Sequence, residues 1–278
     1  MESSGSVVPF ARYGASRGLK WFSQAYRMFR AAPLPWLLLL FGYYFILAVA
    51  ELVPWSGVGT VIGAILKPVF AVGFLAAAWN QERGGKPSPR HLFHGFRSNL
   101  WALIPLGMVF LCGMALALLA TLWVDDGKLI GMLSGTSPPT EQWLSAGRVQ
   151  LAMLVGPLCA LPTVLALWFA PALVVFNDAG AITALATSLR AALANWRPAI
   201  VFGMTAFFYG ALVPTLALTA ARLFGATIAT LIAAVVVLPY MLAFLATFQI
   251  ADYVAYRDVF HADEPTAAKV GSETTYHH

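Results

Sequence analysis

Six long apolar runs constrain the fold of this chain more than any other feature. They cover about residues 35–53, 58–79, 100–124, 151–176, 199–220 and 223–250. Each run is long enough for a helix to cross a bilayer, which takes about 20 apolar residues. The chain is 60% hydrophobic and 10% charged, whereas soluble domains carry about 25% charged residues. The sequence therefore predicts an all-α integral membrane protein with six transmembrane helices.

The distribution of basic residues predicts how the six spans are oriented. Of the 17 Lys and Arg residues, 13 lie on the side of the N-terminus, three on the other side and one, Lys67, within a span. Cytoplasmic loops carry the excess of positive charge. We therefore expect both termini in the cytoplasm. The net charge of +5 is then interpreted as a topology signal and as attraction to anionic lipid, and we expect no nucleic-acid partner.

A short amphipathic segment precedes the first span. Within residues 15–31, one helical face carries Gly18, Phe22, Ala25 and Phe29, and basic side chains lie elsewhere on the helix. This pattern favours a helix lying on the membrane surface. The alternative is a solvated extension of the first span.

The same arrangement recurs before the third and fifth spans, at residues 90–100 and 182–193. The second, fourth and sixth spans each contain a proline, at Pro68, Pro171 and Pro239. We expect three repeats of one unit, in which a cytoplasmic interfacial helix is followed by a pair of spans. The prolines of the fourth span predict a kinked or partly unwound helix. The membrane domain is expected over 15–260, between a flexible tail at 1–14 and a disordered tail at 261–278.

One pattern of residues resembles a known family. It consists of Pro68, Gly73, Gly84-Gly85, Leu92-Phe93-His94-Gly95-Phe96 and Asn195-Trp196-Arg197-Pro198. The pattern is similar to a proteobacterial family of polytopic inner-membrane proteins without an assigned function. More distantly, it resembles the membrane domain of some glycerophosphodiester phosphodiesterases. The resemblance implies a location in the bacterial inner membrane and carries over no catalytic residue.

Lys67 is the one ionisable residue in the middle of a predicted span. A charge there costs roughly 2.5–3.5 kcal/mol on insertion scales. Lys67 could bind an anion or a lipid headgroup, or pair with Glu51. Alternatively, it could face a water-filled dip or extend to the interface.

Three other polar residues are weaker candidates. Asp178 could be an ion site, but a helix N-cap next to Asn177 is the simpler interpretation. His91 and His94 are three residues apart, but a metal site needs further ligands and none is near in the sequence. We therefore expect no metal and no cofactor.

Basic residues beside the predicted surface segments are the candidate lipid contacts. They are Arg27, Arg30, Arg97, Arg190 and Arg197. We expect Arg190 and Arg197 to reach the phosphate layer, each contributing about 1 kcal/mol of attraction to anionic lipid. Arg197 could instead only mark topology.

No familiar catalytic motif is present in the sequence. The leading hypothesis is a non-enzymatic membrane protein that binds lipid or another membrane protein. The alternative is a small transporter or channel-like carrier with a site near Lys67, which would require a polar cavity at mid-membrane that reaches Lys67. An intramembrane enzyme ranks third.

Overall fold

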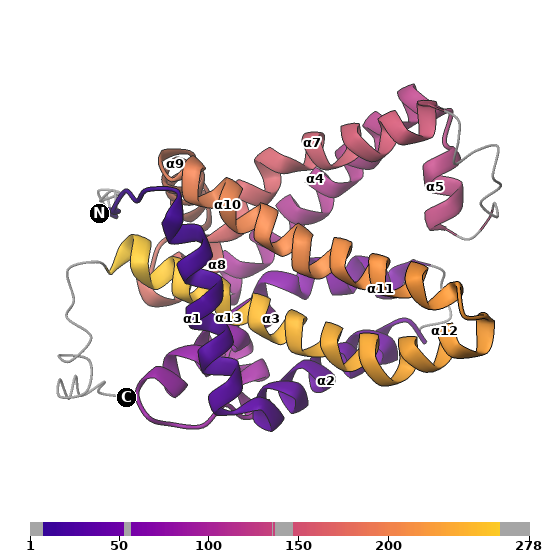
Figure 1. The fold of residues 1–278 in the computed structure, drawn as a ribbon. Helices are drawn as coiled ribbons and strands as arrows, with labels where there is room; N and C mark the ends of the chain where they lie inside the picture. The colour runs from indigo at the N-terminus through magenta and orange to yellow at the C-terminus, as the bar shows by residue number, and fades with distance from the viewer. Residues whose placement is uncertain (1–7, 53–56, 135, 137–146, 262–278) are drawn as a thin grey trace.

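The computed structural model describes residues 8–52, 57–134, 136 and 147–261, and in this part of the chain all regular structure is helical (Figure 1). The elements of the first half are α1 (Ser16–Ala31), α2 (Pro33–Ala50), α3 (Val58–Glu82), η1 (Pro89–Phe93), η2 (Gly95–Arg97), α4 (Leu100–Asp125) and α5 (Lys128–Leu133). Those of the second half are α7 (Gly147–Trp168), α8 (Ala170–Phe176), α9 (Ala181–Ala194), α10 (Trp196–Phe207), η3 (Phe208–Leu212), α11 (Val213–Arg222), α12 (Ala226–Ile232), η4 (Ala233–Val237) and α13 (Leu238–Phe260).

The described residues contain six helices long and apolar enough to cross a membrane, which confirms the predicted number. They are Pro33–Ala50, Val58–Glu82, Leu100–Asp125, Gly147–Phe176, Trp196–Arg222 and Ala226–Phe260. The sixth extends ten residues beyond the predicted limit of 250, and this extension carries polar side chains that are important below. Residue 53, the expected end of the first span, and the expected disordered tail from 262 onward lie outside the described residues.

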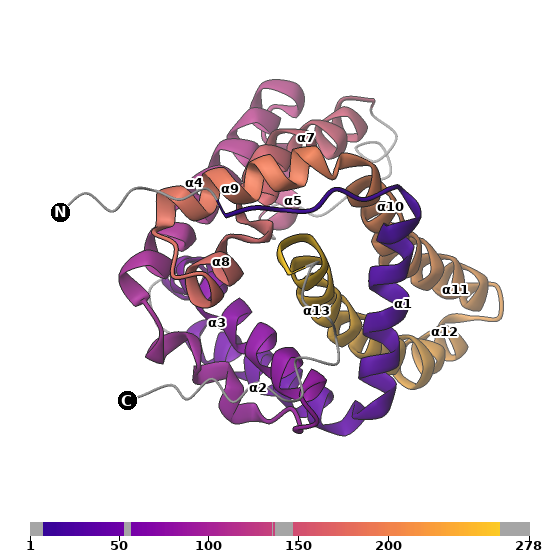
Figure 2. The same ribbon diagram turned by 90° about the vertical axis from the view of Figure 1, so that its left-hand side faces the viewer.

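The six helices form three antiparallel hairpins that converge at one end and separate at the other (Figure 1). The converging end carries α1, η1, η2 and α9, and we call it the capped end. The other end carries the C-terminal end of α2, the N-terminal end of α3, the α11–α12 connection and α5, and we call it the splayed end. Viewed from the capped end, the C-terminal part of α13 lies near the centre of the helices, and the other helices surround it. α1 crosses beside it (Figure 2).

The core lies at the capped end because the second helix of each hairpin is buried there. Pro68–Ala78 of α3, Ala170–Val174 of α8 and most of Ala246–Val259 of α13 have little or no exposed surface. Toward the splayed end, leucines and aromatic side chains are exposed on the helices. Exposed apolar side chains are what a bilayer requires, since lipid tails are as apolar as leucine.

Each segment that precedes a hairpin packs on a different hairpin from the one it leads into. α1 packs on α13 and α10, η1 packs on α3 and α2, and α9 packs on α7 and α8. In α1, the buried residues are Gly18, Trp21, Ala25 and Phe29. The expected apolar face is present, but the protein covers much of it. Residues 8–14, expected as part of a flexible tail, are also attached: the Ala11 N–H donates to the Val259 carbonyl at 2.7 Å.

The glycines of the family-like pattern allow η1 and η2 to dock on α3. A Cβ atom on Gly95 would lie 2.1 Å from the Val69 carbonyl oxygen, and one on Gly73 would lie 2.7 Å from the Leu92 Cα. Any side chain at either position would force the backbones apart. The pattern therefore has a packing role in this structure. Residues 90–100, expected as a surface α-helix, instead form two short 3₁₀ turns, η1 and η2, before α4 begins at Leu100.

The fourth span is interrupted at Phe169, between α7 and α8, two residues before Pro171. This matches the expected unwinding, and a side chain from α9 bridges the freed backbone groups. The Ser188 hydroxyl accepts from the Phe169 N–H at 2.9 Å and donates to the Leu165 carbonyl at 3.0 Å. The Ser188 oxygen thereby replaces the direct hydrogen bond that the Phe169 N–H would donate to the Leu165 carbonyl in an unbroken helix.

α9 packs on the protein through small residues, and one expectation about its start is wrong. Its buried face consists of Ala184, Thr187, Ser188, Ala191 and Ala192, whereas Leu185, Leu189 and Leu193 are half-buried to exposed. Small residues let helix backbones approach closely. Asp178 does not cap α9, because the N-cap is Gly180 and no side chain caps it. Asp178 instead has a φ of 51°, a left-handed conformation that Asp tolerates just after a helix end.

Candidate functional site

A cavity of about 560 Å³ lies between the three hairpins. Its walls come from α2, α3, α4, α7, α8, α10 and α13. Most of the lining side chains are apolar, and several are aromatic, including Phe70, Phe110 and Phe202. The volume lies within the range of about 300–1,000 Å³ that ligand pockets have, and such pockets combine apolar walls with a few placed polar groups.

Two opposite charges line this cavity. Lys67 comes from the middle of α3, and Asp252 comes from α13. The Lys67 Nζ lies 4.2 Å from the centroid of the Phe110 ring, which is a cation–π distance. Lys67 does not pair with Glu51, whose carboxylate accepts from the Thr60 hydroxyl at 2.9 Å instead. The carrier hypothesis requires a polar cavity that reaches Lys67; the cavity does reach Lys67, but its walls are mostly apolar. The expected Glu51 pairing is wrong.

Asp252 is held by an aromatic side chain. The Trp168 indole Nε1 donates to the Asp252 Oδ1 at 2.9 Å. The Trp168 ring stacks on Phe202, with centroids 5.5 Å apart, and Phe202 stacks on Phe248 at 5.4 Å. These rings fix the indole, and the indole in turn fixes one carboxylate oxygen. Within the described part of the chain, no side chain or backbone group donates a hydrogen bond to the second oxygen, Oδ2.

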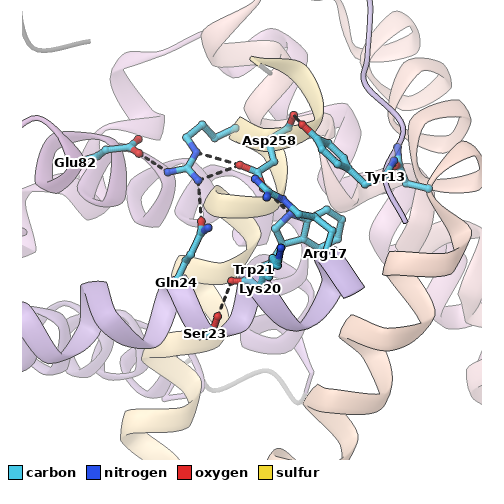
Figure 3. A network of polar contacts seen from close by, with 10 residues as sticks. Tyr13, Arg17, Lys20, Trp21, Ser23, Gln24, Glu82 and Asp258 are labelled. Carbon is cyan, nitrogen blue, oxygen red and sulfur yellow. Dashed lines mark hydrogen bonds and ion pairs between the residues drawn. The ribbon is translucent and has the colours of Figure 1, made fainter. Parts of the chain in front are cut away.

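A buried ionic network lies at the capped end and joins α1, α3 and α13 (Figure 3). Its centre is Asp258, whose side chain is 5% exposed. Asp258 Oδ2 accepts from Arg17 Nε at 2.6 Å and from Trp21 Nε1 at 2.9 Å, and its Oδ1 accepts from Arg257 at 2.9 Å. The buried carboxylate thus accepts hydrogen bonds from two guanidinium groups and one indole.

Arg257 extends the network to α3. Its guanidinium pairs with Glu82 and also donates to the Gln24 amide oxygen at 2.9 Å. The Tyr253 hydroxyl donates to the other Glu82 oxygen. None of the buried side-chain polar atoms in the described residues lacks a hydrogen-bond partner. A network satisfied in this way fixes one arrangement of its three helices.

The extended segment before α1 is attached at the same end. The Tyr13 hydroxyl donates to the Asp258 carbonyl at 2.9 Å, and the Tyr13 N–H donates to the Asn195 side-chain oxygen at 2.9 Å. The Asn195 amide nitrogen donates to the Ala11 carbonyl at 2.9 Å. Asn195, part of the family-like pattern, is therefore a buried link between the N-terminal segment and the start of the fifth span.

The candidate lipid contacts all lie on the surface near the capped end. Arg27, Arg30, Arg97, Arg190 and Arg197 are exposed, and none forms an ion pair with another described residue. Arg197 lies over the Trp196 ring, with its Cζ 5.4 Å from the centroid. The structure therefore separates these arginines from the cavity and from Lys67, and it leaves their guanidinium groups available.

The remaining candidates form no site. His91 Nδ1 lies 3.0 Å from the Ser88 backbone N–H and completes a capping box at the start of η1. Desolvation, with the positive charges of His91 and Arg97, lowers the pKa of His94 below its ordinary value. No group of three possible metal ligands occurs among the described residues. Cys112 and Cys159 are both free thiols.

Sequence reasoning missed Asp252 and the whole ionic network because residues 252–260, although expected to continue the sixth helix, were interpreted as polar and without apolar periodicity. The signal was present in the pattern of residues 250–259. Apolar positions recur there at helical spacing, and the polar residues fall between them. This pattern is typical of an amphipathic continuation buried on one side.

The comparisons with known proteins agree with this architecture. The chain is 28% identical over 262 residues to a probable inner membrane protein of Burkholderia thailandensis, covering 92% of this chain and 95% of that protein. No family model matches the chain, and no solved structure matches it. The likeness to the membrane domain of glycerophosphodiester phosphodiesterases stays a prediction. With its six apolar helices, this chain is a multi-pass helical membrane protein similar to that probable inner membrane protein.

Proposed function

We propose that the protein is a non-enzymatic component of the inner membrane that binds a membrane lipid in its central cavity. The observation that carries the proposal is the cavity itself, in which all three hairpins surround one space with apolar walls and two charges. A lipid offers the same combination, since it joins apolar chains to a charged headgroup. At about 560 Å³, the cavity suits a headgroup and the first part of the chains, whose ends would extend between the hairpins into the bilayer.

The exposed arginines at the capped end support a second, weaker contact with lipid. With both termini in the cytoplasm, as the basic residues favour, these side chains face the anionic cytoplasmic leaflet. Each would contribute about 1 kcal/mol near the surface. The same surface could also receive another membrane protein, with the arginines at its polar rim.

We also infer that the scaffold consists of three related units. The support is the order of contacts. η1 and α9 each pack on the hairpin that precedes them, and α1, which has no hairpin before it, packs on the third hairpin. In this arrangement α1, η1–η2 and α9 are corresponding elements at the membrane interface. The units differ in form, because η1–η2 is not an α-helix.

Native mass spectrometry of the protein extracted in mild detergent tests the lipid proposal. Wild-type protein should retain lipid, and Gly203→Phe should lose most of it. Gly203 lines the cavity, and a Cβ atom there meets nothing within 4 Å, so the ring enters empty space. Met204→Phe is the matched control, because Met204 is 66% exposed and does not line the cavity. Wild-type protein without retained lipid, or equal retention in Gly203→Phe, would contradict the proposal.

A small carrier remains the second candidate, because the cavity reaches Lys67 and because the fourth span is broken at its wall. Carriers place such sites near the bilayer midplane, beside interrupted helices. Reconstitution in vesicles with a fluorescent lipid in one leaflet distinguishes the two functions. A binding protein leaves the leaflet distribution unchanged, whereas a lipid carrier equalises it, and Gly203→Phe should abolish that transfer.

A further inference from the structure

Lys67 and Asp252 line one cavity without forming an ion pair. The salt bridges among the described residues all involve other side chains. Lys67 instead rests on Phe110, and Asp252 is held at one oxygen by Trp168. Two opposite charges that share an apolar space and stay apart leave room for a ligand that carries both charges.

The two charges lie at different depths. Asp252 precedes Arg257 of the ionic network by five residues, roughly 8 Å along α13 at 1.5 Å per residue. Lys67 precedes Glu82 of the same network by 15 residues, roughly 22 Å along α3. The negative charge therefore lies closer to the capped end, and the positive charge lies closer to the middle of the span.

We propose that the cavity selects a zwitterionic phospholipid with a primary ammonium group, such as phosphatidylethanolamine. Asp252 Oδ2 binds the ammonium group, and Lys67 Nζ binds the phosphate. The acyl chains lie against the apolar wall beyond Lys67. The order from the capped end is then ammonium, phosphate and chains, which is the order in a phospholipid of the leaflet at that end. This inference rests on the proposed lipid-binding function.

Charge balance explains the selection. A zwitterionic headgroup neutralises both side chains and adds no net charge to a poorly solvated space. An anionic lipid such as phosphatidylglycerol would neutralise Lys67 but leave Asp252 without a cation, and an unpaired charge in an apolar site is costly. Hydrogen bonds between charged groups are also stronger than neutral ones. The glycerol hydroxyls of phosphatidylglycerol can also donate to Asp252, but only the ammonium group brings a positive charge that neutralises it.

The test is a competition measured by native mass spectrometry. Delipidated protein is mixed with equal amounts of phosphatidylethanolamine and phosphatidylglycerol that have identical chains. We expect wild-type protein to prefer phosphatidylethanolamine by about tenfold, which corresponds to about 1.4 kcal/mol. Asp252→Asn should abolish or reverse this preference, and Lys67→Met should weaken the binding of both lipids. Asp178→Asn and Lys20→Met alter exposed charges outside the cavity and should behave as wild-type.

A measurement without mutation covers the case in which a variant does not fold. Phosphatidylethanolamine with an acetylated amine keeps the phosphate and chains but has no ammonium group. Wild-type protein should bind it about tenfold more weakly than the parent lipid. If wild-type protein retains lipid but binds the acetylated and parent forms equally, or shows no preference in the competition, the zwitterion proposal is wrong and lipid binding stands. If wild-type protein retains no lipid, the proposed function itself is wrong.

Discussion

The capped and splayed ends of the molecule carry ion pairs of the same chemical type in very different surroundings. At the capped end, the side chains of Arg257 and Asp258 are 18% and 5% exposed, and both make further hydrogen bonds. At the splayed end, Arg148 pairs with Asp126 at 3.2 Å, but these side chains are 71% and 73% exposed. Burial makes a broken pair costly, whereas an exposed pair contributes little. The capped end should therefore hold the fold together, and the splayed end should tolerate change.

The largest expected effect comes from the centre of the ionic network. Asp258→Asn removes the charge that balances Arg17 and Arg257 in a buried place, and we expect a loss of about 3–5 kcal/mol in the free energy of unfolding. The matched change at the splayed end, Asp126→Asn, should cost at most about 1 kcal/mol. Denaturant titration in detergent, followed by circular dichroism, measures both. Similar losses in the two variants would remove the distinction between the ends.

The second effect tests how α9 is fixed to the broken fourth span. Ser188→Ala leaves the buried Phe169 N–H and Leu165 carbonyl without their bridging hydroxyl. We expect a loss of about 1–3 kcal/mol, the cost of unsatisfied buried polar groups. In Ser23→Ala, the lost hydroxyl is exposed on α1 and donates to the Lys20 carbonyl. That control should change the same unfolding curve by no more than about 0.5 kcal/mol.

The third effect is on lipid binding at the outside of the capped end. Replacing Arg190 and Arg197 together with Gln should weaken association with anionic vesicles by about 1 kcal/mol for each charge removed. The fold should be unaffected, since both side chains are exposed and make no ion pair with described residues. A control that replaces Arg148 and Arg222, at the splayed end, should leave binding to vesicles of cytoplasmic composition unchanged. Equal losses in both double variants would contradict the assigned orientation.

The smallest expected effect concerns the π-helical segment η3 toward the splayed end. The Tyr240 hydroxyl donates to the Tyr209 carbonyl at 2.6 Å and so links the two helices of the third hairpin. Tyr240→Phe should cost about 0.5–1.5 kcal/mol, the net value of one hydrogen bond. Tyr26→Phe, on the exposed face of α1, serves as the control. A loss as large as that of Asp258→Asn would show that stability is not concentrated at the capped end.

The sequence predicted the parts of this fold that depend on hydrophobicity alone. The number of spans and the break near Pro171 both follow from what an apolar bilayer excludes. The position of Lys67 within a span could also be read from the sequence. It could not predict that Trp21 of α1 would contact Asp258 across 237 positions, because no local pattern encodes a contact so distant along the chain. The same limit explains why α1 was expected on the membrane surface, although its buried residues pack on the protein. That Lys67 and Asp252 line the same cavity follows only from the three-dimensional arrangement of α3 and α13.

Lipid binding in the central cavity can be observed in an electron cryo-microscopy map of the protein in nanodiscs made from its native membrane lipids. We expect elongated density within the cavity, with its head between Lys67 and Asp252 and its chains along the apolar wall between the hairpins. This density should disappear in Gly203→Phe while the ionic network at the capped end is unchanged. A cavity closed by its own side chains, or one without density in a well-resolved map, would contradict lipid binding at this place.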